Sequence, residues 1–374
     1  MYTIKGKYNS ANIMLPEGQF ADDVTTKQIY SFLNHPAFQD TYIVLMPDLH
    51  AGAGSCIGFT MKLNDYVIPN IVGVDIGCGV LTGKLPKNSS INLSSLDEFI
   101  RGNIPSGFNV NDKPMSDRSI LKVPVQAISD KINSNIARNL RAIGTLGGGN
   151  HFIELGIDSN NNQWLTVHTG SRKFGLDIAN YHQKRAKKYI KDNFITGIQT
   201  GLEFMYKDSE YFDDMNVAQL FARENRSKIM SLLTTYLGVE LSERIESVHN
   251  YIDFDTNIIR KGAISAQLNE NVVIPFNMVD GLVIGKGNGN KKWNYSAPHG
   301  AGRILSRTKA KKELDLAYAL KEMQDANIFT TSLNQNTLDE ARGAYKDKDM
   351  ILNAIEETIE VIDFIKPIYN FKAG

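Results

Sequence analysis

The sequence predicts an α+β fold formed by one continuous chain of 374 residues. Segments with helical and strand patterns follow one another without the regular strand–helix–strand rhythm that produces a doubly wound parallel sheet. No internal repeat, low-complexity tract or Pro/Ser-rich linker divides the chain. Helical patterns dominate about 176–240, which we expect to form a helical insertion beside mixed sheets flanked by helices.

Apolar residues that recur at intervals of three and four predict helices. We expect these helices at about 22–34, 126–141, 176–193, 215–237 and 349–365. Runs of β-branched and other apolar residues, several of them followed by Gly-rich turns, predict strands. These runs lie at 41–47, 71–76, 164–168, 272–276 and 282–285.

The composition is that of an ordinary globular protein, with 42% apolar and 22% charged residues. Lys and Arg number 41, as do Asp and Glu, so a nucleic-acid partner would have to be held by a local basic patch. The N-terminus lacks the apolar core of a signal peptide, and we expect a cytoplasmic protein with no membrane partner. Cys56 and Cys78 are expected to be buried or metal-bound rather than disulfide-linked.

The histidines fall into two groups by their sequence context. Five of them lie at or near the ends of extended runs, mostly beside Gly or Asn, where side chains project into clefts. These are His50, His151, His168, His249 and His299. The other two, His35 and His182, lie in helix-end and helix-surface contexts, and for them we expect structural roles.

The segment GVDIGCG places Asp75 and Cys78 three residues apart around a glycine. A carboxylate and a thiolate this close can reach one metal ion or two neighbouring ions. Together with His151, His168 and His249 they would suit Mn, Fe, Co or Zn. A turn-capping Asp and a packed Cys remain the alternative. The absence of CxxC, HExxH and EF-hand motifs argues against structural zinc and zinc proteolysis.

His299 precedes two glycines and an arginine in HGAGR, and a basic stretch follows. Glycines allow a phosphate to approach the backbone closely, and a neutral imidazole can attack phosphorus and carry a nucleotidyl group. The alternative is a tight turn followed by a solvated basic helix. The segment 281–287 departs from a Walker A loop, and no KxDG lysine motif is present, so histidine is the candidate carrier.

Nine segments, in this order, resemble the RtcB family of RNA ligases. They are MPDLHAGAG, VDIGCG, GTLGGGNHFIE, VHTGSR, VHNY, RKGA, SAPHGAGRILSRTKAK, DEARGAYKD and FKAG, and they span residues 46–374. The resemblance implies a single RtcB-like catalytic domain over 1–374. It also implies an enzyme that joins RNA 3′-phosphate or 2′,3′-cyclic phosphate ends to 5′-hydroxyl ends through a histidine–GMP intermediate.

The resemblance assigns roles to individual residues. His299 matches the nucleophile that attacks the α-phosphate of GTP. The metal ligands match Asp75, Cys78, His151, His168 and His249, with Cys78 as a bridging thiolate. The nucleotide contacts match Asn150, Phe152, Glu154, Asn250, Ala301, Gly302, Tyr345 and Lys372. Arg172 matches an arginine suited to holding an RNA phosphate.

The implied cofactors are GTP and two Mn²⁺ ions, with Zn²⁺ or Co²⁺ possible in a preparation. The implied partners are tRNA or rRNA fragments, together with an archease-like activator or a release-factor-like protein. The chain is similar to a compact bacterial subgroup, which suggests RNA repair. It departs from the family at Pro275–Met278 and at Ala53, so the guanine contacts near 275–282 are open.

Two other functions fit the same residues. A dinuclear metallophosphoesterase would use the Asp, Cys and His set without a covalent step. An RNA-binding protein without turnover would keep the fold alone. The basic residues of 184–191 are expected mainly to be a solvated helix face, with an RNA contact as the alternative.

Overall fold

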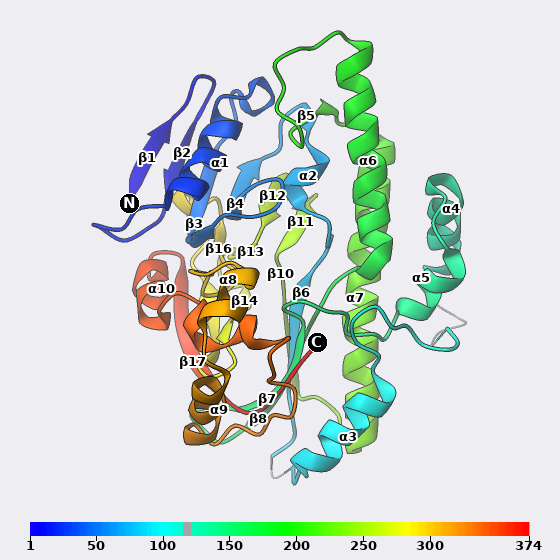
Figure 1. Cartoon of the computed structure of the whole chain (residues 1–374), viewed down its shortest axis with the longest axis vertical. Helices are drawn as coiled ribbons and strands as arrows, with labels where there is room; N and C mark the ends of the chain where they lie inside the picture. Colours follow the sequence, from blue (N-terminus) through cyan, green and yellow to red (C-terminus); the bar gives the residue numbers. More distant parts are fainter. Residues whose placement is uncertain (88, 115–120, 374) are drawn as a thin grey trace.

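The computed structural model describes residues 1–87, 89–114 and 121–373. Its elements build two main sheets with helices around them (Figure 1), which confirms the predicted α+β class. None of the helices in the described ranges combines the length and the apolar character that a membrane span requires.

The smaller main sheet has six strands and contains one parallel pair, β2 with β3. Its strands, in spatial order, are β1 (Tyr2–Lys5), β2 (Ser10–Ile13), β3 (Ile43–His50), β4 (Ile57–Lys62), β12 (Ile258–Lys261) and β11 (Asn250–Asp253). Helix α1 (Asp23–Leu33) begins at Asp22, whose carboxylate accepts hydrogen bonds from Val24 N and Thr25 N. The sheet and α1 share one hydrophobic core, which includes Ile29, Phe32 and Phe59.

The larger sheet has seven strands, and each neighbouring pair is antiparallel. In spatial order they are β10 (Glu243–Val248), β6 (Gly79–Lys84), β8 (Gln163–Thr169), β7 (Phe152–Ile157), β17 (Ile359–Lys372), β15 (Gly281–Gly287) and β14 (Asn271–Asn277). Two short pairs complete the strands: β13 (Ala263–Ser265) with β16 (Ser296–Pro298), and β5 (Tyr66–Val67) with β9 (Met205–Tyr206).

Two long helices, α6 (Arg172–Asp192) and α7 (Ser209–Leu237), run along the long axis of the molecule on one side of the sheets (Figure 1). Helix α7 packs against β6 and β8. The region at 176–240 is therefore mostly helical, as predicted. The remaining helices are α2 (Pro69–Val72), α3 (Leu93–Asn103), α4 (Lys122–Ile132), α5 (Ile136–Ala142), α8 (Arg307–Glu313), α9 (Leu316–Asp325) and α10 (Lys348–Ile355).

Three predicted elements differ in the structure. Residues 71–76 are not a strand, because Pro69 starts the short helix α2 and Gly73, at φ 92°, ends it. The helix predicted at 349–365 stops at Ile355, and the alternating β-branched residues that follow form β17. The helix predicted at 126–141 is split into α4 and α5, because Asn133 adopts a left-handed conformation.

A buried polar cluster ties α4 to α6 and α7. Asp214 accepts hydrogen bonds from His182 Nε2 at 2.8 Å and from Lys131 Nζ at 2.6 Å. His182 is fully buried, and its Nδ1 lies 3.1 Å from Arg185. His35 is also buried, and its Nδ1 caps a short helix by accepting a hydrogen bond from Ala37 N. Both environments fit the structural roles predicted for these two histidines, but His182 lies in the protein interior and not on the helix surface that its sequence context indicated.

Replacing Asp214 with alanine should therefore destabilise the fold. The change leaves Lys131 and His182 without their shared acceptor, and breaking such a buried pair costs about 3–5 kcal/mol. Asp192→Ala breaks the exposed Lys188–Asp192 pair and should cost under about 1 kcal/mol. Urea unfolding monitored by circular dichroism measures both. Equal losses in the two variants would contradict this account.

Candidate active site

The strand register of the larger sheet gathers the predicted metal ligands at one end of four neighbouring strands. Gly79, next to Cys78, pairs with Thr169 and with Val248. His168 pairs with Phe152, the neighbour of His151. His249 follows β10 directly, and its N–H donates to Cys78 O at 2.9 Å. Residues from positions 78 to 249 thus meet because antiparallel pairing places their strand ends together.

Two groups of ligand atoms share the Cys78 sulfur. In one group Cys78 Sγ lies 3.3 Å from His168 Nε2, which lies 3.3 Å from His249 Nε2. In the other group Cys78 Sγ lies 3.5 Å from His151 Nε2, which lies 3.0 Å from Asp75 Oδ2. The geometry therefore brings together all five residues predicted as ligands. The Cys78 sulfur belongs to both groups of ligand atoms.

Backbone carbonyls fix the orientation of two of these rings. His151 Nδ1 donates to Leu146 O at 2.8 Å, and His168 Nδ1 donates to Asn150 O at 3.1 Å. Both rings consequently present the Nε2 lone pair to the sulfur, as histidine ligands do when the other nitrogen is hydrogen-bonded. Lone pairs of nitrogen and sulfur facing one another at these distances fit a cation between them. The residues therefore suit a pair of transition-metal ions.

Burial determines the charge of the ligands before a metal binds. It lowers the pKa of His168 and His249 well below the ordinary value, so both imidazoles are neutral. Burial also raises the pKa of the Cys78 thiol well above its ordinary value, and the nearby Asp75 carboxylate adds to the effect. A bound divalent cation reverses this preference and deprotonates the sulfur, so metal binding should release a proton.

Two adjacent side chains of α7, Asn225 and Arg226, hold the backbone next to the predicted metal ligands through hydrogen bonds. Arg226 is fully buried and donates from Nη1 to Gly77 O at 2.6 Å and to Thr169 O at 2.9 Å. Its Nε donates to Glu246 at 2.8 Å. Asn225 is also fully buried, and its side-chain amide bonds to the backbone of 144–145 and of Gly170 and to Thr169 Oγ1. Sequence reasoning missed both residues.

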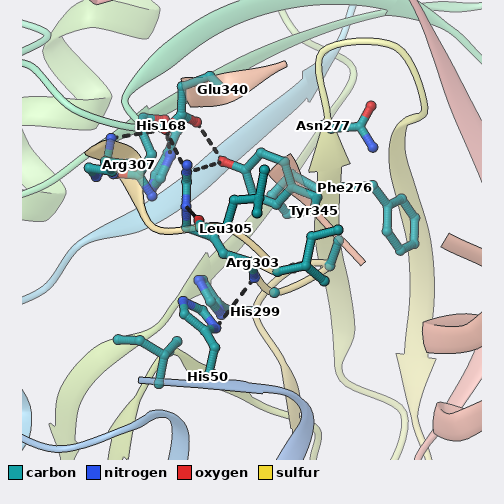
Figure 2. Close-up of a pocket in the computed structure, with 18 of the residues that line it drawn as sticks. His50, His168, Phe276, Asn277, His299, Arg303, Leu305, Arg307, Glu340 and Tyr345 are labelled. Carbon is teal, nitrogen blue, oxygen red and sulfur yellow. Dashed lines mark hydrogen bonds and ion pairs between the residues drawn. The ribbon is translucent and has the colours of Figure 1, made fainter. Parts of the chain in front are cut away.

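His299 lies beside this ligand cluster, and its ring centroid is 4.8 Å from that of His249. Its Nδ1 donates to the fully buried carboxylate of Asp48 at 2.6 Å. Nε2 is then left as a free lone pair, the arrangement that prepares an imidazole for nucleophilic attack. His50 is close to His299 in the same cleft (Figure 2). Sequence reasoning missed Asp48, although it lies two residues before His50 in the first motif.

A cleft of about 750 Å³ opens over His299 and the ligand cluster. This volume is in the usual range for a nucleotide-sized ligand. Its walls include every residue predicted to contact nucleotide, namely Asn150, Phe152, Glu154, Asn250, Ala301, Gly302, Tyr345 and Lys372. Asp75, Cys78, His168, His249 and His299 also line it. Residues 275–278, where the sequence departs from the family motif, form part of the same wall and therefore still face the cleft.

Glu340 organises the charged end of the cleft. The buried carboxylate accepts from Arg303 at 3.1 Å, Arg307 at 2.9 Å and Tyr345 Oη at 2.6 Å (Figure 2). Lys372 Nζ lies 3.2 Å from the same carboxylate, so this lysine is a buried component of the cleft rather than a solvated tail. Sequence reasoning missed Glu340, although it belongs to the DEARGAYKD segment.

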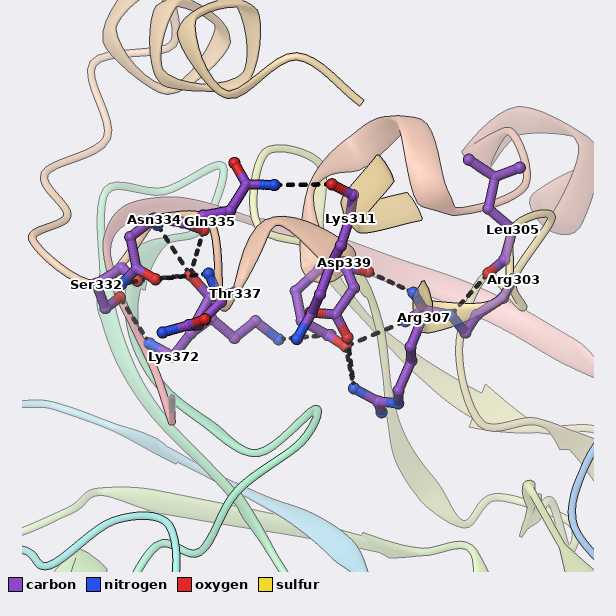
Figure 3. Close-up of polar contacts among 12 residues, drawn as sticks. Arg303, Leu305, Arg307, Lys311, Ser332, Asn334, Gln335, Thr337, Asp339 and Lys372 are labelled. Carbon is purple, nitrogen blue, oxygen red and sulfur yellow. Dashed lines mark hydrogen bonds and ion pairs between the residues drawn. The ribbon is translucent and has the colours of Figure 1, made fainter. Parts of the chain in front are cut away.

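The basic stretch after His299 is largely neutralised by acidic side chains. Arg307 and Lys311 both reach Asp339, at 2.8 and 3.3 Å (Figure 3). Lys309 pairs with Glu313 at 3.8 Å. Most basic side chains of this stretch are therefore ion-paired with carboxylates and are not free to bind phosphate.

Arg172 lies outside the wall of the cleft but close to the ligand cluster. Its Nε donates to Thr145 Oγ1 at 3.1 Å and its Nη2 to Gly107 O at 2.6 Å. Burial acts to raise the pKa of the Asp75 carboxyl, but the hydrogen bond to His151 and, to a smaller degree, the charge of Arg172 leave it lowered. The position of Arg172 is compatible with the predicted phosphate contact.

Comparison with known proteins gives one consistent family. A family model described as "tRNA-splicing ligase RtcB" matches residues 28–134 and 117–373. The chain is 31% identical over 369 residues to "RNA-splicing ligase RtcB" of Escherichia coli K12, with 87% of this chain and 89% of that protein covered. It is 27% identical over 405 residues to "tRNA-splicing ligase RtcB" of Nanoarchaeum equitans, with 84% of each covered.

Removing the charge of Arg226 should weaken metal binding. Arg226→Met keeps a side chain of similar length but removes the donors that hold Gly77 O and Thr169 O. Loss of such a supporting contact typically costs about 10- to 100-fold in metal affinity. Titration with Co²⁺, followed by the thiolate charge-transfer absorption, measures this affinity. Arg223→Met is the matched control, since Arg223 is exposed on the same helix and pairs with the same Glu246. Unchanged Co²⁺ affinity in a folded Arg226→Met protein would refute the role.

The contribution of Glu154 to the stability of the metal-free protein should fall as the pH rises from about 5 to 8, whereas the buried, neutral His168 and His249 act in the opposite direction. Burial raises the pKa of Glu154 to about 8 from an ordinary value of 4.5, against opposing effects of Asn370 and Lys372. The folded state therefore holds a proton that the unfolded state has released, and this stabilisation is lost as the pH approaches 8. The difference in stability between Glu154→Gln and the wild type should therefore shift in favour of the variant, by on the order of a few kcal/mol over the interval. Urea unfolding of both proteins at several pH values tests this, and a difference that does not vary with pH would refute it.

Proposed function

The chain belongs to the RtcB family, and from this premise we propose that it is an RNA ligase that works through a histidine–GMP intermediate. It joins an RNA 3′-phosphate to a 5′-hydroxyl. The observation that carries the proposal is the Asp48–His299 pair, which prepares an imidazole lone pair beside a cluster of five metal-ligand residues.

Asp48 makes His299 a nucleophile in the first step. Because Nδ1–H is donated to the buried carboxylate, Nε2 is free to attack the α-phosphorus of GTP. A phosphorus–nitrogen bond forms, the bond to the bridging oxygen breaks, and pyrophosphate leaves. The Asp48 carboxylate stabilises the positive charge that develops on the ring, as the carboxylate of a catalytic triad does.

Asp75, Cys78, His151, His168 and His249 would hold the two metal ions, with Cys78 as the bridge. When bound, the ions would neutralise the triphosphate and polarise the α-phosphorus. Mn²⁺ is the proposed metal, and Zn²⁺ or Co²⁺ would fit the same mixed ligand set.

The cleft contains groups suited to guanine. Glu154 Oε1 is buried without a hydrogen-bond partner among the described residues, so this carboxyl group has a free polar atom with which to hydrogen-bond the edge of the base. Tyr345 and Lys372 lie at the charged end near Glu340, where they can close around the nucleotide. The preference for GTP over other nucleotides rests on these groups.

In the second step an RNA 3′-phosphate oxygen attacks the phosphorus of the His299 adduct, and the phosphorus–nitrogen bond breaks. The activated end then accepts the 5′-hydroxyl of the second strand, and GMP leaves. A 2′,3′-cyclic phosphate would first be opened by water to a 3′-phosphate. Fragments of tRNA or rRNA in the cytoplasm are the proposed substrates. An archease-like activator or a release-factor-like partner stays a prediction.

The names of the relatives favour a ligase over a dinuclear phosphoesterase. The complete ligand set argues against a protein that has only kept the fold. The acidic neighbours of α6 weaken the case for RNA binding at 184–191, because Arg185 pairs with Asp208 and Lys188 with Asp192.

Incubation with GTP labelled at the α-phosphate and Mn²⁺ should label the protein with an acid-labile, alkali-stable adduct. His299→Ala should abolish labelling, and Asp48→Asn should slow it by about 10²- to 10⁴-fold, because the ring loses its orienting carboxylate. His35→Gln, a change outside the cleft, serves as the control. Full labelling of His299→Ala would exclude the proposed nucleophile.

A further inference from the structure

A glycine loop runs along the edge of the ligand cluster between two guanidinium groups. Gly147 and Gly149 have φ values of 87° and 75°, which favour glycine. A Cβ on Gly147 would overlap the guanidinium of Arg172, and one on Gly149 would lie 3.7 Å from that of Arg307. Arg307 lines the His299 cleft, so the loop leads from that cleft towards Arg172.

A second loop, residues 105–109, lies against the far end of this glycine loop. Gly107 N donates to Gly147 O at 2.7 Å, and Gly107 O accepts from Arg172 at 2.6 Å. Arg138 of α5 donates to Phe108 O at 2.6 Å. Hydrogen bonds at Gly107 and at Phe108 O therefore anchor the backbone on either side of the Phe108 side chain, yet Phe108 is 92% exposed. A single exposed ring is ordinary on a protein surface, but a ring held next to guanidinium groups is the combination that binds single-stranded nucleic acid.

The two arginines beside Phe108 are Arg138 and Arg172. Over the described ranges, neither Arg138 nor Arg172 has a carboxylate within ion-pair distance, and the acceptors they use are backbone carbonyls and a threonine hydroxyl. Burial lowers the pKa of Arg172, the Asp75 carboxylate opposes this effect, and the charge of Arg138 adds to the lowering, so the two guanidiniums lie near each other. Two neighbouring guanidiniums without an ion-pair partner among the described residues favour a bound anion, and phosphate fits their geometry.

We propose that Phe108 and Arg138 form a docking subsite for the RNA strand whose end reaches the cleft. Phe108 stacks on a base, and Arg138 binds a backbone phosphate next to Arg172. Single-stranded nucleic acid is bound by this combination of an aromatic platform with a basic track. The inference rests on the proposed function and adds a position for the strand: from the cleft, past Arg307 and the glycine loop, to Phe108.

The test is the affinity of the full-length, Mn²⁺-loaded protein for a short fluorescent single-stranded RNA ending in a 3′-phosphate, measured by anisotropy without GTP. Phe108→Ala should weaken binding about 5- to 100-fold, the range for loss of one stacked base. Arg138→Ala should weaken it about tenfold and reduce the salt dependence by about 0.7 in the log–log slope. Phe108→Ala should leave that slope unchanged.

Two matched variants control for the loss of any exposed aromatic ring or any surface charge. Phe194→Ala removes a ring that is 90% exposed at the end of α6, and Lys321→Ala removes a charge on α9. Both should bind RNA like the wild type, and thermal melting checks that all four variants are folded. Affinities of the Phe108 and Arg138 variants within twofold of wild type would overturn the subsite. So would equal losses in the controls.

Failure of the subsite and failure of the proposed function give different results. Absence of the His299 adduct in wild-type protein would reject the ligase mechanism, whatever the RNA affinities are. A wild-type protein that forms the adduct, with RNA binding indifferent to Phe108 and Arg138, would reject the subsite alone. If Phe108 bound only DNA or another protein, the Phe108 and Arg138 substitutions would leave the RNA affinity unchanged, and the proposal would be wrong.

Discussion

The Cys78 sulfur, shared between two groups of lone-pair donors, is the constraint on which the rest of the site depends. His168 and His249 approach it on one side, and His151 with Asp75 on the other. In a buried setting such donors repel one another unless a proton or a metal cation lies between them. The antiparallel register of β6, β7, β8 and β10 holds them together, and α7 secures their backbones through Asn225 and Arg226.

The predicted metal ligands and the predicted nucleophile His299 come from different parts of the fold but line one cleft. The ligand cluster is built on strand ends of the larger sheet, whereas His299 follows β16 and is oriented by Asp48 of β3 in the smaller sheet. The nucleophile and the metal site therefore come from different sheets, and the cleft lies where the sheets meet. Glu340 anchors the far end by gathering Arg303, Arg307 and Lys372. A triphosphate entering this cleft would meet both centres at once.

The mixture of helical and strand patterns predicted the α+β class. The five ligand residues and His299 were predicted because each of them lies in a short segment with its own chemical signature. Patterns failed at 71–76, where Pro69 and Gly73 delimit a short helix. They also failed at 349–365, where the residues after Ile355 fit helix and strand patterns alike and pairing with β15 and β7 selects the strand. Arg226 was missed because it has no motif. Its signal was a charged residue on the otherwise apolar face that includes Ala222, Ile229 and Leu233. Asp48 and Glu340 were within recognised segments, but only the fold shows that they face His299 and Arg303.

The most direct test of the central claim is anomalous X-ray diffraction from crystals of the protein grown with Mn²⁺. The account predicts two manganese peaks with the Cys78 sulfur between them, one facing His168 and His249 and the other facing Asp75 and His151. A single peak that does not contact the sulfur, or saturating Mn²⁺ bound only elsewhere, would contradict it.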